Sequence, residues 1–206
     1  AGERALVVEF GATVDPAVNG QVLALDAAFV AAGIAGVRET VPTYRSLMIH
    51  YDPLVISRAA LVSRIAQFEE AHPAAARPQA RWTFPCCYDP AIAEDIAELA
   101  ALVHLGVADV ARLHAGGAYR AYMYGFAPGY CYLGGLPQEL AVSRRATVRG
   151  PTPENAVLVG GGLSLVATFS MPTGWYVAGR TPERMFAAHR ARPFLVDVGD
   201  ELRFEP

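Results

Sequence analysis

The sequence predicts an α+β N-terminal domain followed by a mainly β domain, and three observations carry this prediction. Strand-like and helix-like apolar patterns alternate over residues 4–68. The run that follows, at residues 72–78, contains two prolines and shows neither pattern. From residue 119 onward, short β-rich runs are separated by glycine and proline. We therefore expect domains at residues 1–72 and 82–206, joined by a linker at 73–81.

The first domain reads as a β-α-β-β-α unit. In its first helix the apolar residues recur every three or four positions, and Gly33 is expected to end that helix. Ser57 can cap a second helix, which presents Leu61, Ile65 and Phe68 on one face. The expected elements are strands at residues 4–10, 37–41 and 47–51, and helices at residues 16–32 and after Ser57.

The second domain opens with a strand and two helices and continues with strands. Residues 82–88 are strand-like, Asp89-Pro90 is a typical helix start, and a short helix is expected at residues 107–114. Six more strands and the turns between them favour a small barrel or a sandwich. These strands are expected at residues 119–124, 156–159, 163–168, 175–178, 194–196 and 201–204.

Composition excludes several classes of partner. The chain is 53% hydrophobic and 18% charged, with a net charge of -3, so it has no cationic surplus for nucleic acid or a membrane surface. Acidic residues interrupt its longest apolar stretches, and its start shows no signal-peptide pattern, so we expect a cytoplasmic protein. The three cysteines lack zinc-site spacing, and no bound metal is expected.

The most unusual segment is residues 122–137, which read YMYGFAPGYCYLGGLP. Glycine and proline fix an irregular backbone there, while the aromatic residues supply flat apolar walls. Such a segment suits a groove for a planar ligand or a partner loop, and it equally suits a packed barrel corner.

Arginine and histidine supply the charged candidates. Arg180 can bind a carboxylate or phosphate, or it can tie a turn to the barrel. Arg144, Arg145 and Arg149 form a cluster that suits an anionic substrate or an acidic partner, although a solvated loop is the simpler interpretation. His114 ends the second short helix, where the helix dipole favours its cation, so it is a weak candidate for a proton carrier near neutral pH.

A carboxylate and an amide stand side by side at Glu154 and Asn155. Paired hydrogen bonds from these two side chains can orient a urea-like or amide substrate. The alternative is a turn-forming asparagine beside a solvated glutamate.

Several motifs together resemble one known family. They are His114 followed by Tyr119, the run GFAPGY at residues 125–130, YLGGLP at 132–137, Arg144-Arg145, and Trp175 followed by GRTP at 179–182. The chain resembles the family called allophanate hydrolase subunit 1, the kinase inhibitor KipI, or the B subunit of 5-oxoprolinase. The resemblance implies that the second domain is a cyclophilin-like barrel.

The resemblance and the residue chemistry together define a candidate groove for substrate or a partner. Its members are Tyr119, Phe126, Pro128, Gly129, Tyr132, Arg144, Arg145, Glu154, Asn155, Trp175 and Arg180. The sequence departs from the family pattern at residues 152–157, where TPENAV is similar to urea carboxylases.

Three functions follow from the resemblance. The first is a non-autonomous subunit of an ATP-dependent 5-oxoprolinase-type hydrolase, acting on C–N bonds with a second cyclophilin-like subunit (allophanate hydrolase subunit 2) and a larger amidohydrolase-type subunit. The second is half of the carboxyltransferase of a biotin-dependent urea-type carboxylase. The third is an inhibitor of a sensor histidine kinase. No cofactor is expected on this chain alone; ATP belongs to the assembled complex, and biotin to the second alternative.

Overall fold

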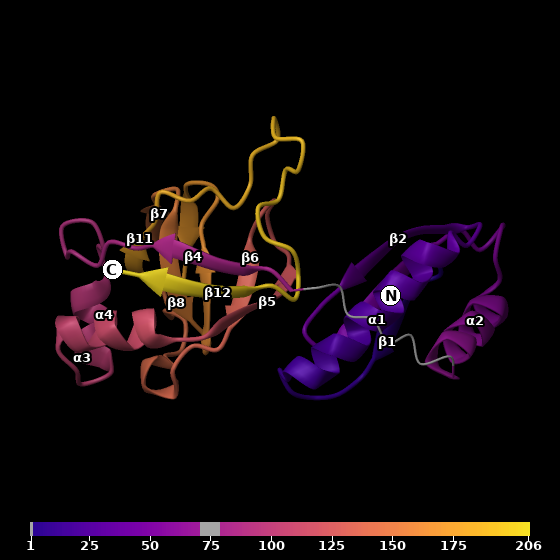
Figure 1. Cartoon of the computed structure of the whole chain (residues 1–206), viewed down its shortest axis with the longest axis horizontal. Helices are drawn as coiled ribbons and strands as arrows, with labels where there is room; N and C mark the ends of the chain where they lie inside the picture. Colours follow the sequence, from indigo (N-terminus) through magenta and orange to yellow (C-terminus); the bar gives the residue numbers. More distant parts are fainter. Residues whose placement is uncertain (1, 71–78) are drawn as a thin grey trace. The chain divides into compact units, whose positions relative to one another are not determined.

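The computed structural model describes residues 2–70 and 79–206 (Figure 1). The chain separates into two compact units, Ala1–Gln79 and Ala80–Pro206, which we call unit 1 and unit 2. The predicted linker at residues 73–81 lies mostly outside the described residues, and its last residue, Arg81, begins a strand. The predicted domain boundaries therefore stay a prediction.

Unit 1 is a three-stranded antiparallel sheet packed against two helices. Its elements are β1 (Ala5–Glu9), α1 (Pro16–Ala32), β2 (Val37–Pro42), β3 (Ser46–Tyr51) and α2 (Arg58–Glu70). The sheet order is β1-β3-β2, so the last strand in sequence lies at the centre. The predicted β-α-β-β-α order is confirmed.

The helix ends of unit 1 follow from the residues that cap them. Asp15 Oδ1 accepts hydrogen bonds from the backbone N–H groups of Ala17 and Val18, at 2.7 and 3.2 Å. Gly33 ends α1, as predicted, and it does so in the left-handed conformation. Ser57 Oγ accepts the N–H of Ala60 at 3.2 Å. Both helices then bury one face against alternate residues of β3. The shared core is Val22, Leu25, Phe29, Leu47, Ile49, Tyr51, Leu61 and Ile65.

Unit 2 has two short helices and a large mixed sheet. Its helices are α3 (Ile96–Leu102), α4 (Val107–Gly116) and the 3-10 turn η1 (Gln138–Leu140). Its strands are β4 (Arg81–Pro85), β5 (Tyr119–Tyr124), β6 (Cys131–Gly134), β7 (Arg149–Thr152), β8 (Ala156–Gly160), β9 (Leu163–Val166), β10 (Met171–Thr173), β11 (Tyr176–Arg180) and β12 (Glu201–Glu205).

The main sheet of unit 2 curls until its two ends meet. Seven strands run in the order β11-β8-β9-β6-β5-β12-β4, with β12 and β4 parallel. Just beyond β4, Cys87 pairs with Arg180 at the end of β11, through N–H···O bonds of 2.8 and 3.0 Å. Strands β7 and β10 form a separate two-stranded ribbon. Over the described residues, helices with a curled mixed sheet are consistent with an α+β fold, whereas the division into an α+β domain and a mainly β, cyclophilin-like domain stays a prediction.

Apolar side chains bury both faces of the strands β8, β9 and β11. On β8, Val157 and Val159 join the larger core, which also includes the buried residues of α3 and α4. Ala156 and Leu158 point to the other face, where they pack with Tyr130 and Trp175. The second face is therefore covered by the glycine-rich segment that the sequence singled out.

Three expectations for unit 2 were wrong in detail. The helix expected from Asp89 starts only at Ile96, and the residues between them form turns, with Asp89 Oδ1 accepting the N–H of Ala91. The strand expected at residues 194–196 is reduced to one bridge, Phe186 to Phe194. Strands β6, β7 and β10 were not expected, since glycine and proline obscure their pattern.

Within the described residues, no helix has the length and apolarity required to cross a bilayer.

Candidate functional site

The loop between β5 and β6 holds an exposed phenylalanine in a strained conformation. Phe126 has φ +72° and is 81% exposed. A bulky side chain at positive φ costs roughly 1–2 kcal/mol, and such strain is typical of ligand or partner clamps. The loop is nevertheless closed by the hydrogen bond from Gly125 N–H to Tyr130 O, at 3.1 Å. The Phe126 ring stands edge-on to Tyr130, with centroids 5.7 Å apart.

Pro128 and Gly129 fix this loop against other parts of unit 2. The Thr168 hydroxyl donates to Pro128 O at 2.7 Å. Gly129 has φ +77°, and a Cβ there would lie 2.3 Å from Cβ of Phe186. Only glycine permits this contact, so the loop packs directly on the connection that leads to β12.

Aromatic rings continue from this contact along the surface. Phe169 lies 6.2 Å from Phe186, and Phe186 lies 5.3 Å from Phe194, between ring centroids. Phe169 and Phe194 are 37% and 39% exposed. We call Phe126, Phe169, Phe186 and Phe194 the aromatic ridge. Of these four, only Phe126 was among the predicted groove residues; Phe194 was expected to begin a strand, and Phe169 and Phe186 lie outside the predicted elements.

Three further groove candidates meet around Trp175. The guanidinium of Arg144 lies 5.0 Å from the Trp175 ring centroid, and the centroid of the Tyr132 ring lies 6.1 Å from it. Trp175 itself is buried and packs closely on Gly160, whose Cβ position is 3.1 Å from the indole. Since Tyr130 belongs to the same cluster, this group and the Phe126 loop lie on one face of the sheet.

Arg145 and Arg149 are used inside unit 2, which corrects the expectation of an arginine cluster for an anionic ligand. Arg145 donates to both carboxylate oxygens of Glu98, at 2.7 and 2.5 Å, and its Nη2 lies 3.2 Å from Asp95 Oδ1. Arg149 pairs with Asp95 and Glu94. Asp95 also accepts the N–H of Val177 in β11, at 2.8 Å. These carboxylates raise the pKa of both arginines.

Glu154 and Asn155 form the turn between β7 and β8, and Arg180 at the end of β11 binds this turn. Arg180 Nη2 donates to the backbone oxygen of Glu154 at 3.1 Å, while the Glu154 side chain is exposed. Asn155 has φ +62°. Its backbone N–H donates to Ala167 O at 2.8 Å, and its backbone oxygen accepts from Thr181 N–H at 3.0 Å. This geometry favours the interpretation in which Arg180 ties the turn to β11.

His114 and Tyr119 lie inside the core and outside any surface groove, which corrects their assignment. Tyr119 is 1% exposed and donates its hydroxyl to the backbone oxygen of His114 at 2.9 Å. Tyr88 Oη and Ser164 Oγ lie 2.8 and 3.2 Å from Nδ1 and Nε2 of His114. Ser164 donates to the oxygen of Leu158, so it accepts from Nε2, and Tyr88 donates to Nδ1.

Burial lowers the pKa of His114 to about 3. The imidazole is therefore neutral at pH 7 and does not carry protons near neutrality. The helix dipole, on which that expectation rested, is outweighed by the loss of water around a fully buried ring. Among residues 2–70 and 79–206, no three His, Cys, Asp or Glu side chains group in a way that could hold a metal ion.

The chain matches the family described as carboxyltransferase domain, subdomain C and D, over residues 1–196. It therefore belongs to this family. It is also 29% identical to the B subunit of 5-oxoprolinase from Bacillus subtilis (strain 168), over 98% of this chain and 89% of that protein. These matches confirm the family resemblance drawn from the motifs. The likeness of residues 152–157 to urea carboxylases stays a prediction.

Solved structures share the fold. TTHA0988 is 31% identical and superimposes with a TM-score of 0.87 over 98% of this chain, which spans only 39% of that longer chain. Kluyveromyces lactis urea carboxylase is 16% identical, with a TM-score of 0.78 over 100% of this chain and 21% of its own length. The second likeness concerns the fold alone.

The Asp95 contacts predict a large effect of a small substitution. Asp95→Asn keeps the shape but removes the charge that two half-buried arginines share, so the free energy of unfolding should fall by about 2–4 kcal/mol. Urea denaturation measures it. Asp109→Asn is the matched control, since Asp109 pairs with Arg112 on an exposed surface and should change stability by less than about 0.5 kcal/mol. Equal effects of the two substitutions would contradict this role of Asp95.

Burial of His114 predicts a pH-dependent stability. The unfolded histidine gains a proton below about pH 6.5, whereas the folded one stays neutral down to about pH 3. Stability is therefore present above pH 6.5 and is lost as the pH falls, with a slope approaching about 1.4 kcal/mol per pH unit. In His114→Gln, the urea midpoint should change less with pH between pH ~5 and 6.5 than it does in the unchanged chain. In the exposed His189→Gln, the midpoint should keep the pH dependence of the unchanged chain. An unchanged slope in His114→Gln would place the titration elsewhere.

Proposed function

We propose that this chain is a non-autonomous subunit of a 5-oxoprolinase-type complex, in which it contributes a binding face and a partner interface. Its Bacillus subtilis relative is named as the B subunit of 5-oxoprolinase, and the alignment covers nearly all of both proteins. The reaction of such a complex opens a lactam C–N bond with ATP. We assign ATP to the assembled complex, with no cofactor held by this chain alone.

The observation that carries the proposal is the exposed aromatic surface beside the Phe126 loop. Phe126 is held outward by a strained backbone, and Phe169 and Phe194 are also partly exposed. Aromatic rings are among the side chains most enriched where proteins bind each other. Four of the charged candidates are already paired or buried, so we expect a second subunit to supply catalytic groups; these four are His114, Arg145, Arg149 and Arg180. The expected partners are a second cyclophilin-like subunit and a larger amidohydrolase-type subunit.

Arg144 is the best candidate for direct contact with substrate, and the buried indole of Trp175 supports its guanidinium. Arg144 is exposed and stacks on the indole, which leaves the edges of its guanidinium open to a carboxylate. The Tyr132 ring packs near the same indole. A lactam that bears a carboxylate, such as 5-oxoproline, suits this pair chemically.

A second candidate function is favoured by the family description, carboxyltransferase domain. In that case the same face would receive a carboxylated biotin between this chain and a partner. Arg144 would then bind the carboxylate of the biotin group. The two functions differ in substrate and cofactor while sharing the need for a partner.

Co-expression with the reading frames beside this one tests the proposal. The assembled complex should hydrolyse 5-oxoproline with ATP, and the chain alone should not. Phe126→Asn keeps a residue that tolerates positive φ but removes the ring, so it should weaken assembly by about tenfold or more without lowering the melting temperature.

Leu102→Asn on α3 is the matched control, because Leu102 is also exposed and apolar. It should leave assembly unchanged. Turnover by the isolated chain would contradict the need for a partner. Turnover of carboxybiotin and urea by the complex, with none of 5-oxoproline, would select the second function.

A further inference from the structure

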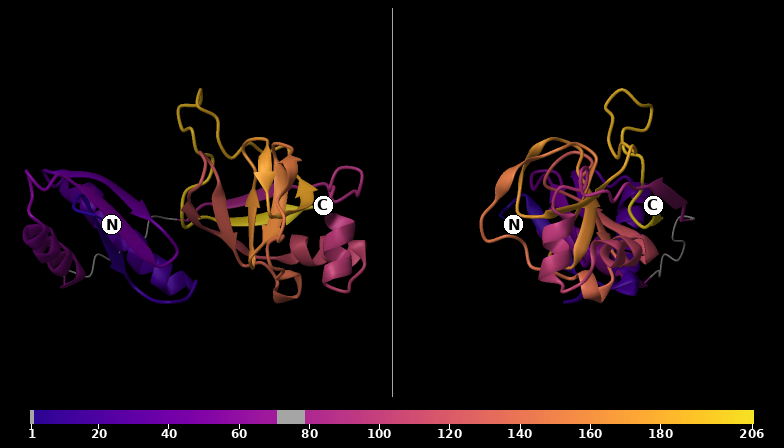
Figure 2. Two further views of the ribbon diagram at one scale, coloured as in Figure 1. Left: turned by 180° about the vertical axis from the view of Figure 1, so that it is seen from behind. Right: turned by 90° about the vertical axis from the view of Figure 1, so that its left-hand side faces the viewer.

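The connection between β11 and β12 projects from unit 2 as a long loop, visible in both views of Figure 2. Its two sides are paired at the base. Leu195 N–H donates to Met185 O and Ala187 N–H donates to Pro193 O, both at 2.9 Å. Met185 is fully buried in the larger core, so the base is anchored. We call residues 184–194 the arginine loop.

One arginine holds the tip of this loop in shape. Arg190 Nη2 donates to the backbone oxygens of Arg184 and Pro193, both at 2.9 Å. The Arg190 N–H also donates to Ala187 O at 3.1 Å. A loop that is already ordered loses less conformational entropy on binding, so it can bind more tightly than a flexible one.

The arginine loop is locally basic in an acidic chain. Residues 184–194 contain three arginines and His189 but no aspartate or glutamate, whereas the whole chain has a net charge of -3. Arg184 and His189 are exposed at the surface of the loop. Arg192 pairs with Asp197, at 2.6 Å, and is the one of the three that has a carboxylate partner among the residues described here.

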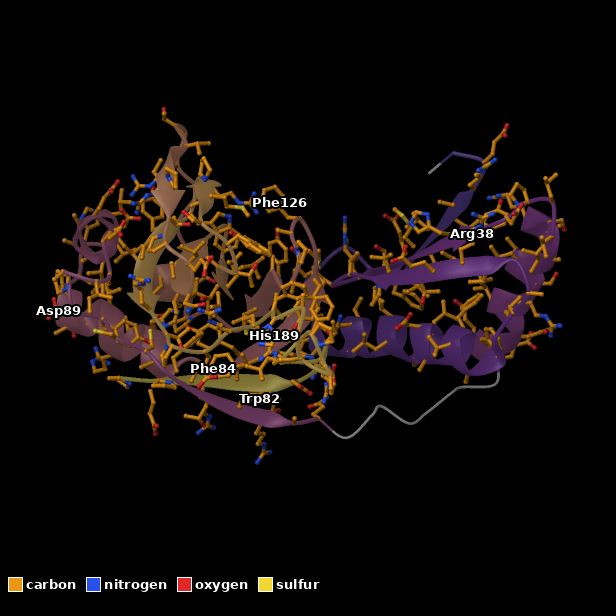
Figure 3. All side chains as sticks on the ribbon, turned by 90° about the horizontal axis from the view of Figure 1, so that it is seen from above. Arg38, Trp82, Phe84, Asp89, Phe126 and His189 are labelled. Carbon is orange, nitrogen blue, oxygen red and sulfur yellow. The ribbon has the colours of Figure 1, made fainter. Side chains whose placement is uncertain are left out.

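Aromatic rings lie at the foot of this basic tip. Phe186 and Phe194 pair across the base, and Phe186 contacts the Phe126 loop through Gly129. Figure 3 shows Phe126 and His189 toward the same end of unit 2, with Asp89 toward the other. The arginine loop and the aromatic ridge therefore form one surface, in which apolar rings lie beside exposed positive charge.

We propose that the arginine loop is the docking element by which this chain binds a partner protein, and that the partner offers an apolar pocket with an acidic rim. The rings match an apolar floor, the guanidinium of Arg184 matches carboxylates around it, and the His189 ring can hydrogen-bond to them. This inference rests on the proposed function in that the partner is another subunit of the same complex. In TTHA0988 the region similar to this chain is joined to further protein in one polypeptide, which provides a precedent for a protein neighbour.

Replacing the two exposed side chains Arg184 and His189 by glutamate tests the inference. The variant Arg184→Glu with His189→Glu should bind the co-expressed subunits about tenfold more weakly, or worse, in a titration of the purified full chain at low salt. Binding by the unchanged chain should weaken as salt rises, and binding by the variant should depend less on salt. Because both side chains are exposed, the melting temperature should not change.

Arg203→Glu is the matched control, since Arg203 is exposed on β12 of the same unit. It should bind the other subunits within about twofold of the unchanged chain. An active complex that is indifferent to the Arg184→Glu and His189→Glu variant would overturn the docking role and leave the proposed function standing. If the variant disrupts the complex but the unchanged complex does not hydrolyse 5-oxoproline, the docking role stands and the proposed function is overturned.

Nucleic acid is the competing occupant of a basic loop. A fluorescently labelled RNA of mixed sequence serves as the probe. Tight binding of this RNA that the variant abolishes, together with unchanged binding to the other subunits, would overturn a protein partner. No RNA binding by the unchanged chain at physiological salt is the expected result.

Discussion

The carboxylate of Asp95 joins three parts of unit 2 that are far apart in the sequence. It accepts a backbone hydrogen bond from Val177 in the end strand β11, and it pairs with Arg145 and Arg149 from the segment before and within β7. It lies directly before α3, so the same contacts fix that helix on the sheet. A buried charge is tolerated only when it is paired and hydrogen-bonded, and here both conditions are met.

This constraint determines which cations are left to meet other molecules. Because Arg145 and Arg149 neutralise the acidic residues around α3, the binding surface is built elsewhere, from Arg144 on Trp175 and from the arginine loop. The aromatic ridge connects with that loop through the contact at Gly129. Unit 2 thus separates a paired, structural set of charges from an exposed set beside aromatic rings. The exposed set is the one we assign to substrate and partner.

The sequence predicted the elements with strong periodicity and missed those made of glycine and proline. Unit 1 follows its caps and apolar patterns, and the family assignment followed from motifs. The site was harder to predict, because pairing and burial are long-range properties. The residues near Arg145 in sequence do not predict its pairing with Glu98. The position of His114 at a helix end does not predict that the ring is buried. Phe126 was found from its loop composition, since the glycine and proline residues that shape this loop are its neighbours in sequence.

The central claim is that the Phe126 loop and the arginine loop together meet another subunit. Hydrogen–deuterium exchange of the full chain, free and in the co-expressed complex, tests it most directly. The account predicts slower exchange on assembly at residues 125–130 and 184–194, with α3 and α4 unchanged. Unchanged exchange in both loops, with new protection confined to other elements, would contradict it.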